Sequence, residues 1–241
     1  MGEETIAAIA TGAGEGGIGI VRLSGADALA VADRVFRPRR GLPLGQRRSH
    51  TVTYGWVQTA SGEWVDEALA LVMRAPHSYT GEDVVELQCH GGQLAVRRVL
   101  ETTLQAGARL AEPGEFTRRA FLNGRLDLSQ AEAVVDLIRA KTDRAMAAAV
   151  AHLGGSLRDA IGSIRSRLLE MMAHVEADID FPELELEVQT REEIVAGCDE
   201  TLAAVERLLG GARAGRILRE GLRVVLAGRP NVGKSSLLNR L

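Results

Sequence analysis

The strongest chemical signal in the sequence lies near its end, where residues 228–235 fit the pattern G-x-x-x-x-G-K-[ST]. Glycines at these spacings let the backbone curl so that successive N–H groups point at one phosphate group. In such a loop Lys234 reaches the β- and γ-phosphates, and the Ser235 hydroxyl binds Mg²⁺. The apolar run 224–227 before the loop is typical of a strand, and a helix is expected from Leu237. The pattern therefore predicts nucleotide binding by the intact protein, against the alternative of a glycine-rich turn that matches by chance.

Few residues follow this loop. A P-loop domain is an α/β unit of several strands, and about twenty residues cannot bury a core of their own. Residues 220–241 are therefore expected to be only the start of a nucleotide-binding domain. Nucleotide hydrolysis by these 241 residues alone is not expected. An ordinary P-loop ATPase stays open as an alternative, because these 241 residues do not include the motifs that select the base of the nucleotide.

Two charged residues interrupt apolar strands in the first half of the chain. Arg22 lies in a run of apolar residues, and Glu86 lies in another. A buried carboxylate is costly unless it is paired or bound to a ligand, so both residues are candidate site residues. The alternatives are side chains that face solvent or that pair with each other. For His90, a turn histidine bonded to backbone is favoured over a catalytic role.

Charge and cysteine content restrict the class of protein. The net charge of −3 argues against a surface that is basic throughout. Six arginines lie between residues 34 and 48, in an exposed loop that either contacts nucleic acid phosphates or is simply solvated. The chain has two cysteines, Cys89 and Cys198. Both are expected to be buried free thiols rather than partners in a disulfide. With no signal-like or membrane-spanning segment, a cytoplasmic protein without membrane contact is expected.

The hydrophobic pattern predicts an α+β fold. Strands are expected at residues 5–10, 18–25, 51–56, 68–73 and 84–89, with a glycine-rich hairpin loop between the first two. Helices are expected at residues 26–36, 93–106 and 113–123. From Ser129 the spacing is helical to about residue 220, which predicts an antiparallel helix bundle with a break at residues 180–183. The expected parts are a mixed α/β domain (1–125), a helical domain (126–219) and the start of an α/β nucleotide-binding domain (220–241).

Several blocks of sequence, taken together in this order, resemble the MnmE (TrmE) family of tRNA-modifying GTPases. The blocks are GGIGIVRLSG (16–25), SYTGED (78–83), ELQCHGG (86–92), PGEFTRRAFLN (113–123), LDLSQAEA (126–133) and GRPNVGKSS (228–236). The resemblance covers essentially the whole chain. It implies a folate-binding N-terminal domain that pairs two chains into a homodimer, and a helical domain into which a Ras-like G domain is inserted.

The resemblance also implies a reaction. With the flavoprotein MnmG, such a protein adds a (carboxymethyl)aminomethyl group to C5 of the wobble uridine of certain tRNAs. The one-carbon unit would come from a tetrahydrofolate, in the 5-formyl or the 5,10-methylene form. GTP, Mg²⁺ and K⁺ are the other implied cofactors. Two alternatives remain: a folate-binding dimerisation module whose G domain only regulates a partner enzyme, and a purely structural N-terminal domain.

Site residues are carried over from the family position by position. Arg22, Glu86 and Arg125 fall where the family contacts folate; the last position is lysine in some members, which keeps the charge but changes the donor geometry. Ser235 falls on the Mg²⁺ ligand, and Asn231 on the residue that binds an activating K⁺, which would stabilise charge on the transferred phosphoryl group. The implied GTP-binding residues are Asn231, Val232, Gly233, Lys234, Ser235 and Ser236.

Overall fold

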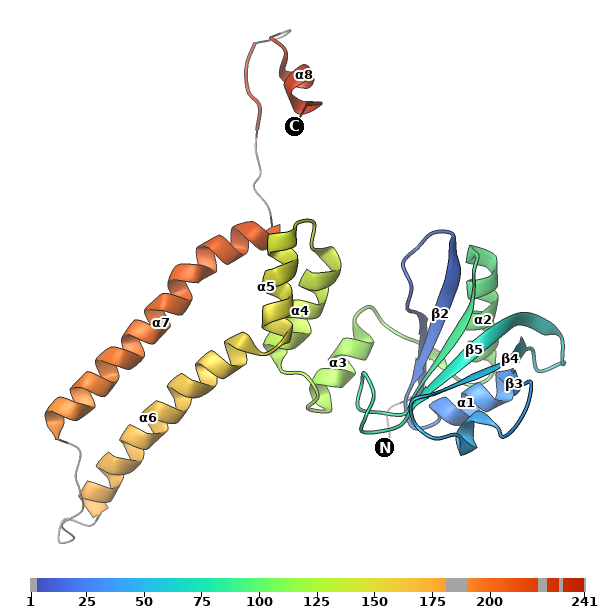
Figure 1. The fold of residues 1–241 in the computed structure, drawn as a ribbon, viewed down its shortest axis with the longest axis horizontal. Coiled ribbons are helices and arrows are strands. Elements are labelled where there is room, and N and C mark those ends of the chain that lie inside the picture. Colours follow the sequence, from blue (N-terminus) through green and yellow to red (C-terminus); the bar gives the residue numbers. More distant parts are fainter. Residues whose placement is uncertain (1–3, 181–189, 221–224, 230–231, 241) are drawn as a thin grey trace. The chain divides into compact units, whose positions relative to one another are not determined.

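The computed structural model describes residues 4–180, 190–220, 225–229 and 232–240 of the chain. The chain divides into two compact units, Met1–Ala131 and Glu132–Leu241, called unit 1 and unit 2 below. Unit 1 holds a mixed sheet with helices, and unit 2 is helical, which confirms the predicted α+β class (Figure 1).

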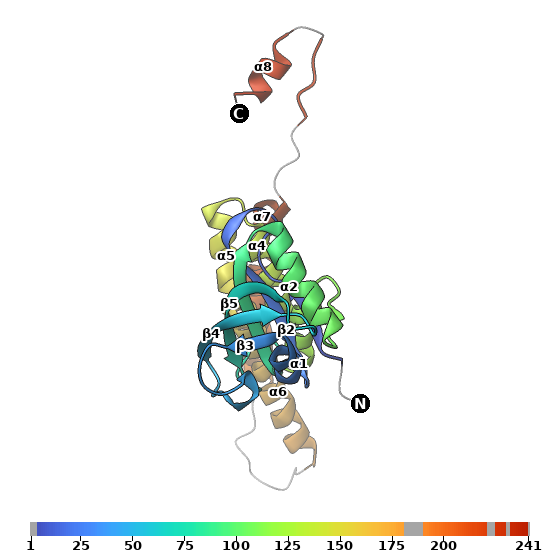
Figure 2. The ribbon, with the colours of Figure 1, turned by 90° about the vertical axis from the view of Figure 1, so that its right-hand side faces the viewer.

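Unit 1 is built on a seven-stranded sheet with the strand order β3-β4-β5-β6-β2-β1-β7. The strands are β1 (Ile6–Ile9), β2 (Gly16–Ser24), β3 (Phe36–Pro38), β4 (Thr51–Gln58), β5 (Trp64–Met73), β6 (Val84–Gly91) and β7 (Arg109–Leu110). Neighbouring strands are antiparallel except for β1 and β7. The expected β1–β2 hairpin is present, β4 and β5 form a second antiparallel pair, and β3 to β5 lie next to one another (Figure 2).

The two faces of this sheet have different chemistry because side chains alternate along each strand. On one face Val21, Leu23 and Leu87 are fully buried against α1 (Ala28–Val35) and α2 (Gln93–Gln105). On the opposite face, called the outer face below, stand Arg22 and Glu86. The expected helices at 26–36 and 93–106 are therefore confirmed, and both pack on the face opposite to Arg22 and Glu86.

A third helix, α3 (Glu115–Leu122), brings a buried charge cluster to the end of the sheet. The side chains of Arg119 and Glu115 are each only 1% exposed and form an ion pair of 3.0 Å. Arg119 also contacts Glu82 at 3.1 Å, and Glu115 accepts from Arg109 at 2.6 Å. Because buried charges are tolerated only when paired, this cluster fixes α3 against the loop before β6.

The described secondary structure of unit 2 consists of helices. Its helices are α4 (Leu128–Arg139, which starts in unit 1), α5 (Asp143–Leu153), α6 (Ser156–Asp180), α7 (Arg191–Glu220) and α8 (Lys234–Leu238). Asp127 begins α4 as expected, since its carboxylate accepts from the backbone N–H of Gln130 at 2.8 Å. The expected break at residues 180–183 falls almost wholly outside the described residues.

The expected helix bundle is only partly formed by these helices. α5, α6 and α7 contact one another, and Met171 and Thr201 are buried. Most of the apolar stripe, including Ile161, Met172 and Leu202, is exposed. Two long helices can bury each other along a single line of contact only, so closing these stripes needs further helices.

Three other expectations differ from the structure. Residues 225–228 form no strand, because a strand needs a hydrogen-bonded neighbour and the described part of unit 2 supplies none. The helix after the phosphate loop begins at Lys234, three residues before the expected Leu237. Cys89 is buried as expected, but Cys198 is exposed on α7, and both thiols are free. No helix among the described residues has the length and apolar character needed to cross a membrane.

Replacing Glu115 with glutamine should lower the free energy of unfolding of unit 1 by about 3 kcal/mol at neutral pH, because buried Arg119 loses a charged partner. Hydrogen bonding by Arg109 holds the pKa of the Glu115 carboxyl at about 2, below its ordinary value of 4.5. A lowered pKa means that this stabilisation is complete above about pH 4.5 and is lost as the pH falls toward 2.

Urea unfolding, followed by the fluorescence of Trp56 and Trp64 in unit 1, measures this effect at neutral pH and near pH 3. The matched control is Glu112→Gln, which alters an exposed carboxylate and should change little. A Glu115→Gln penalty of the same size at both pH values would contradict the assignment of the effect to this carboxylate's charge.

Candidate functional site

The two charged residues that interrupt apolar strands lie directly opposite each other on the outer face. Arg22 of β2 and Glu86 of β6 are cross-strand partners. Nε of Arg22 donates to Oε1 of Glu86 at 2.8 Å, and Nη2 contacts the same oxygen at 2.7 Å. Within the described part of the chain, Oε2 of Glu86 accepts no hydrogen bond. The pair thus neutralises both charges yet leaves one carboxylate oxygen available.

Tyr79 brings the third candidate residue to this pair. The Arg22 guanidinium carbon lies 5.2 Å from the centroid of the Tyr79 ring, and that of Arg125 lies 5.1 Å from the same ring. Phe116 of α3 contacts Arg22 at 5.8 Å. Each such cation–π contact contributes about 0.5–2 kcal/mol, more when it is shielded from water. Arg22, Glu86 and Arg125, far apart in sequence, therefore form one cluster around an aromatic ring.

The loop that carries Tyr79 is held from three sides. The Tyr79 hydroxyl lies 2.9 Å from that of Thr117 on α3. Asn123 donates to the backbone carbonyl of Thr80 at 2.7 Å, and Gly81 adopts a φ of 78°, which favours glycine. The Glu82 carboxylate accepts from the Ser24 hydroxyl at 2.6 Å and from Arg119. The ring therefore has a fixed position, which is what a binding site needs.

The sequence did not single out Tyr79, Phe116 and Glu82 as site residues. Two signals were available. Tyr79 is one of only two tyrosines in a chain with 3% aromatic residues, and it sits in a polar loop that leads into the strand of Glu86. What the sequence could not show is that the loop and α3 meet over β2.

This cluster can bind a planar molecule that carries both hydrogen-bond donors and negative charge. The free oxygen of Glu86 accepts from ring N–H groups, and the two guanidiniums bind carboxylates or carbonyl oxygens. The faces of Tyr79 and Phe116 offer apolar contact. These groups suit the binding and orientation of a ligand.

His90 lies in a different place and has a different partner. It is in β6, not in a turn, so the expected turn histidine bonded to backbone is wrong. Its Nδ1 lies 2.7 Å from Oδ1 of Asp66, and its backbone N–H donates to Oδ2 at 2.9 Å. The hydrogen bond to Asp66 raises the pKa of the His90 imidazole above its ordinary value. His90 contacts none of the residues around Tyr79.

The phosphate-loop residues belong to unit 2. Gly233 has a φ of 88° and precedes α8, as the turn into a helix requires. The ammonium group of Lys234 donates to the carbonyls of Gly228 at 3.0 Å and Arg229 at 2.6 Å. Ser235 and Ser236 are exposed, and Asn231 lies outside the described residues. The described part of the loop thus has the left-handed glycine that leads into the helix, and backbone carbonyls hold the Lys234 ammonium.

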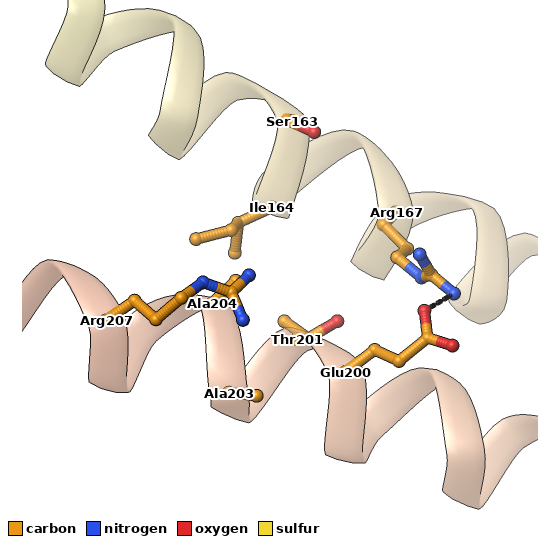
Figure 3. A pocket seen from close by; sticks show the side chains of 8 residues that line it. All are labelled: Ser163, Ile164, Arg167, Glu200, Thr201, Ala203, Ala204 and Arg207. Carbon is orange, nitrogen blue, oxygen red and sulfur yellow. Dashed lines mark ion pairs between the residues drawn. The ribbon is translucent and has the colours of Figure 1, made fainter.

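A cavity of about 330 Å³ lies between α6 and α7 (Figure 3). Arg167 and Glu200 form an ion pair at one end of it, and Arg207 reaches toward Ile164 at the other. The Thr201 hydroxyl, which lies between them, donates to the carbonyl of Gly197. Arg167, Glu200 and Thr201 thus already have partners, and no candidate site residue from the sequence lines this cavity.

Comparisons with known proteins agree with the sequence blocks. Residues 5–125 match the family model of the GTP-binding protein TrmE N-terminus, and residues 128–236 match that of the MnmE helical domain. Proteins named tRNA modification GTPase MnmE are 88% identical in Symbiobacterium thermophilum (all of this chain, 53% of that protein) and 57% identical in Moorella thermoacetica (all of this chain, 52% of that protein). One from Chloroflexus aurantiacus is 60% identical over 99% of this chain and 51% of its own length. The chain spans about half the length of the curated relatives it matches.

Replacing Asp66 with asparagine should lower the pKa of His90, because the asparagine removes the negative charge that favours the imidazolium. A raised pKa in the folded state contributes stability below the ordinary pKa of 6.5, and this is lost as the pH rises through the folded value. Proton NMR titration of the imidazole signals, assigned with His90→Gln, measures the pKa in both proteins. Asp83→Asn is the matched control. An unchanged His90 pKa in Asp66→Asn would refute the assigned cause.

Proposed function

The chain belongs to the MnmE (TrmE) family, and on that premise we propose that the whole protein is a GTP-binding, GTP-hydrolysing enzyme of tRNA modification. With the flavoprotein MnmG it adds a (carboxymethyl)aminomethyl group to C5 of the wobble uridine, in the cytoplasm. Support comes from the names of the relatives and from the two family models, which together span most of the chain. Functions that depend on the parts of the relatives outside this chain are proposed only because the chain belongs to the family.

We further propose that unit 1 binds a tetrahydrofolate derivative at the cluster around Tyr79. The observation that carries this is the meeting of Arg22, Glu86 and Arg125 at one ring. A reduced folate has a planar pterin with N–H donors and a glutamate tail with carboxylates, which fits a carboxylate, two guanidiniums and two aromatic faces. When bound, the folate supplies the one-carbon unit; Glu86 orients its ring, and the arginines hold its anionic groups.

For GTP, the proposed ligands are residues 231–236. When GTP binds, the Lys234 ammonium would leave the carbonyls of Gly228 and Arg229 and bind the β- and γ-phosphates, whose negative charge makes a stronger hydrogen bond. The Ser235 hydroxyl would hold Mg²⁺, and the Asn231 side chain would hold K⁺. The 241 residues alone are expected to bind folate and to pair as a homodimer through unit 1, without hydrolysing GTP.

The alternative functions make different use of the same residues. One is a folate-binding dimerisation module whose G domain only regulates a partner enzyme. The other is a structural domain, and the Arg22–Glu86 ion pair favours it because both charges are satisfied without a ligand. The free oxygen of Glu86 and the second arginine on Tyr79 favour a ligand, because a structural pair needs neither.

Calorimetric titration of the 241-residue chain with 5-formyltetrahydrofolate separates these functions. Arg22→Ala and Glu86→Ala should each abolish measurable binding. Tyr79→Phe, which keeps the ring, should bind within about threefold of the parent, whereas Tyr79→Leu should bind at least tenfold more weakly because two cation–π contacts are lost. Arg97→Ala removes an exposed arginine of α2 and is the matched control.

No heat of binding with the parent chain, while it elutes as a dimer, would favour the structural alternative. Binding that survives in both Arg22→Ala and Glu86→Ala would move the folate site elsewhere.

A further inference from the structure

Positive charge is concentrated in one segment of unit 1. Residues 34–62 contain six arginines and no aspartate or glutamate, although the whole chain has a net charge of −3. Within the described part of the chain, none of these arginines forms an ion pair with a carboxylate. Arginines elsewhere in unit 1 commonly do: Arg22, Arg97, Arg109, Arg118 and Arg119 are all paired. The charge in this segment is therefore left for an external anion.

The loop that follows β3 is held in shape by its own hydrogen bonds. The Asp33 carboxylate accepts from the backbone N–H groups of Leu44 at 2.6 Å and Gly45 at 2.8 Å. Arg47 donates to the carbonyls of Leu42 and Arg40, both at 2.9 Å. Arg47 and the Asp33 carboxylate thus organise the loop, while Arg39 and Arg40 remain exposed. A partner would bind these arginines without first ordering the loop.

Aromatic side chains lie beside this charge on the outer face. Arg37 is the cross-strand partner of Trp56, and the Arg39 guanidinium lies 5.7 Å from the Tyr54 ring centroid. The rings of Trp56 and Trp64 are 5.3 Å apart and inclined at 62°. Trp64 is 59% exposed, which is unusual for so large a side chain. Both tryptophans and one of the two tyrosines of the chain gather here.

We propose that this edge of the sheet, made of Arg37, Arg39, Arg40, Tyr54, Trp56 and Trp64 and called the basic edge below, binds an unpaired loop of RNA. Guanidiniums bind phosphates, and exposed aromatic rings stack on bases, which are free only where the RNA is unpaired. An acidic protein would satisfy the arginines but would leave the tryptophans unused. Glu67, the cross-strand partner of Trp56, carries a carboxylate that accepts from the Tyr54 hydroxyl at 2.6 Å and so repels phosphate less than a free one. The identity of the RNA as tRNA rests on the proposed function.

The test is fluorescence anisotropy with a labelled RNA hairpin whose loop is unpaired, beside a fully paired duplex of the same length. The 241-residue chain should bind the hairpin more tightly. The double variant Arg39→Ala/Arg40→Ala should weaken hairpin binding about tenfold and reduce the slope of log K against log salt by about 1.4, since two phosphate contacts are removed. Trp64→Ala should also weaken it about tenfold, with little change in the salt slope.

Arg97→Ala removes the same charge from α2 and should bind as the parent does. Hairpin affinity unchanged in both basic-edge variants would overturn the proposal, and so would equal affinity of the parent for hairpin and duplex. If light scattering instead shows that the variants dissociate a dimer while hairpin affinity is kept, the basic edge contacts a second copy of the chain. Folate titration of the same variants should match the parent, so failure here is distinct from failure of the folate proposal.

Discussion

The geometry of unit 1 depends on a single buried cation. The Arg119 side chain is almost wholly enclosed, and its guanidinium donates to the carbonyl of Glu4 at 2.8 Å, to Glu115 and to Glu82. Removing water from a guanidinium costs several kcal/mol, so each partner must stay in place for the folded state to hold. The segment before β1, helix α3 and the loop before β6 therefore cannot shift independently, although they are up to 115 residues apart in sequence.

The candidate site takes its rigidity from that cation through Glu82. Its carboxylate contacts Arg119 on one side and the Ser24 hydroxyl on the other, and Ser24 lies two residues from Arg22 in β2. Ser24 also lies 2.7 Å from the Thr80 hydroxyl, next to Tyr79. The loop that carries Tyr79 and strand β2 are thus joined by two short hydrogen bonds of Ser24, and the one to Glu82 is charge-assisted. These bonds hold in place the ring that both arginines contact.

Sequence patterns located what is local and missed what depends on distant neighbours. Alternation and helical spacing found β1, β2, β4 to β6 and the long helices, and apolar context marked Arg22 and Glu86 as unusual. Tyr79 and Phe116 gave no such signal, because their role comes from a loop and a helix that meet only in the fold. The strand expected at residues 224–227 failed for the opposite reason: its residues favour a strand, but hydrogen-bonding partners decide whether one forms. Cys198 shows the same limit, since a helical stripe is buried only where another element covers it.

The register of the sheet places the cluster around Tyr79 and the basic edge on the same face. Arg22 pairs with Glu86, Glu86 with Leu71 and Leu71 with Val52, so these side chains stand in one row on the outer face. Tyr54 and Trp56 follow Val52 at alternate positions of β4, and alternation keeps them on that face. From β2 to β4 is three strand spacings, or roughly 14 Å. A molecule held at the basic edge would thus lie about 14 Å from a ligand at Arg22, on the same face of the sheet. One face of the sheet can therefore hold both a one-carbon donor and the acceptor that the proposed reaction requires.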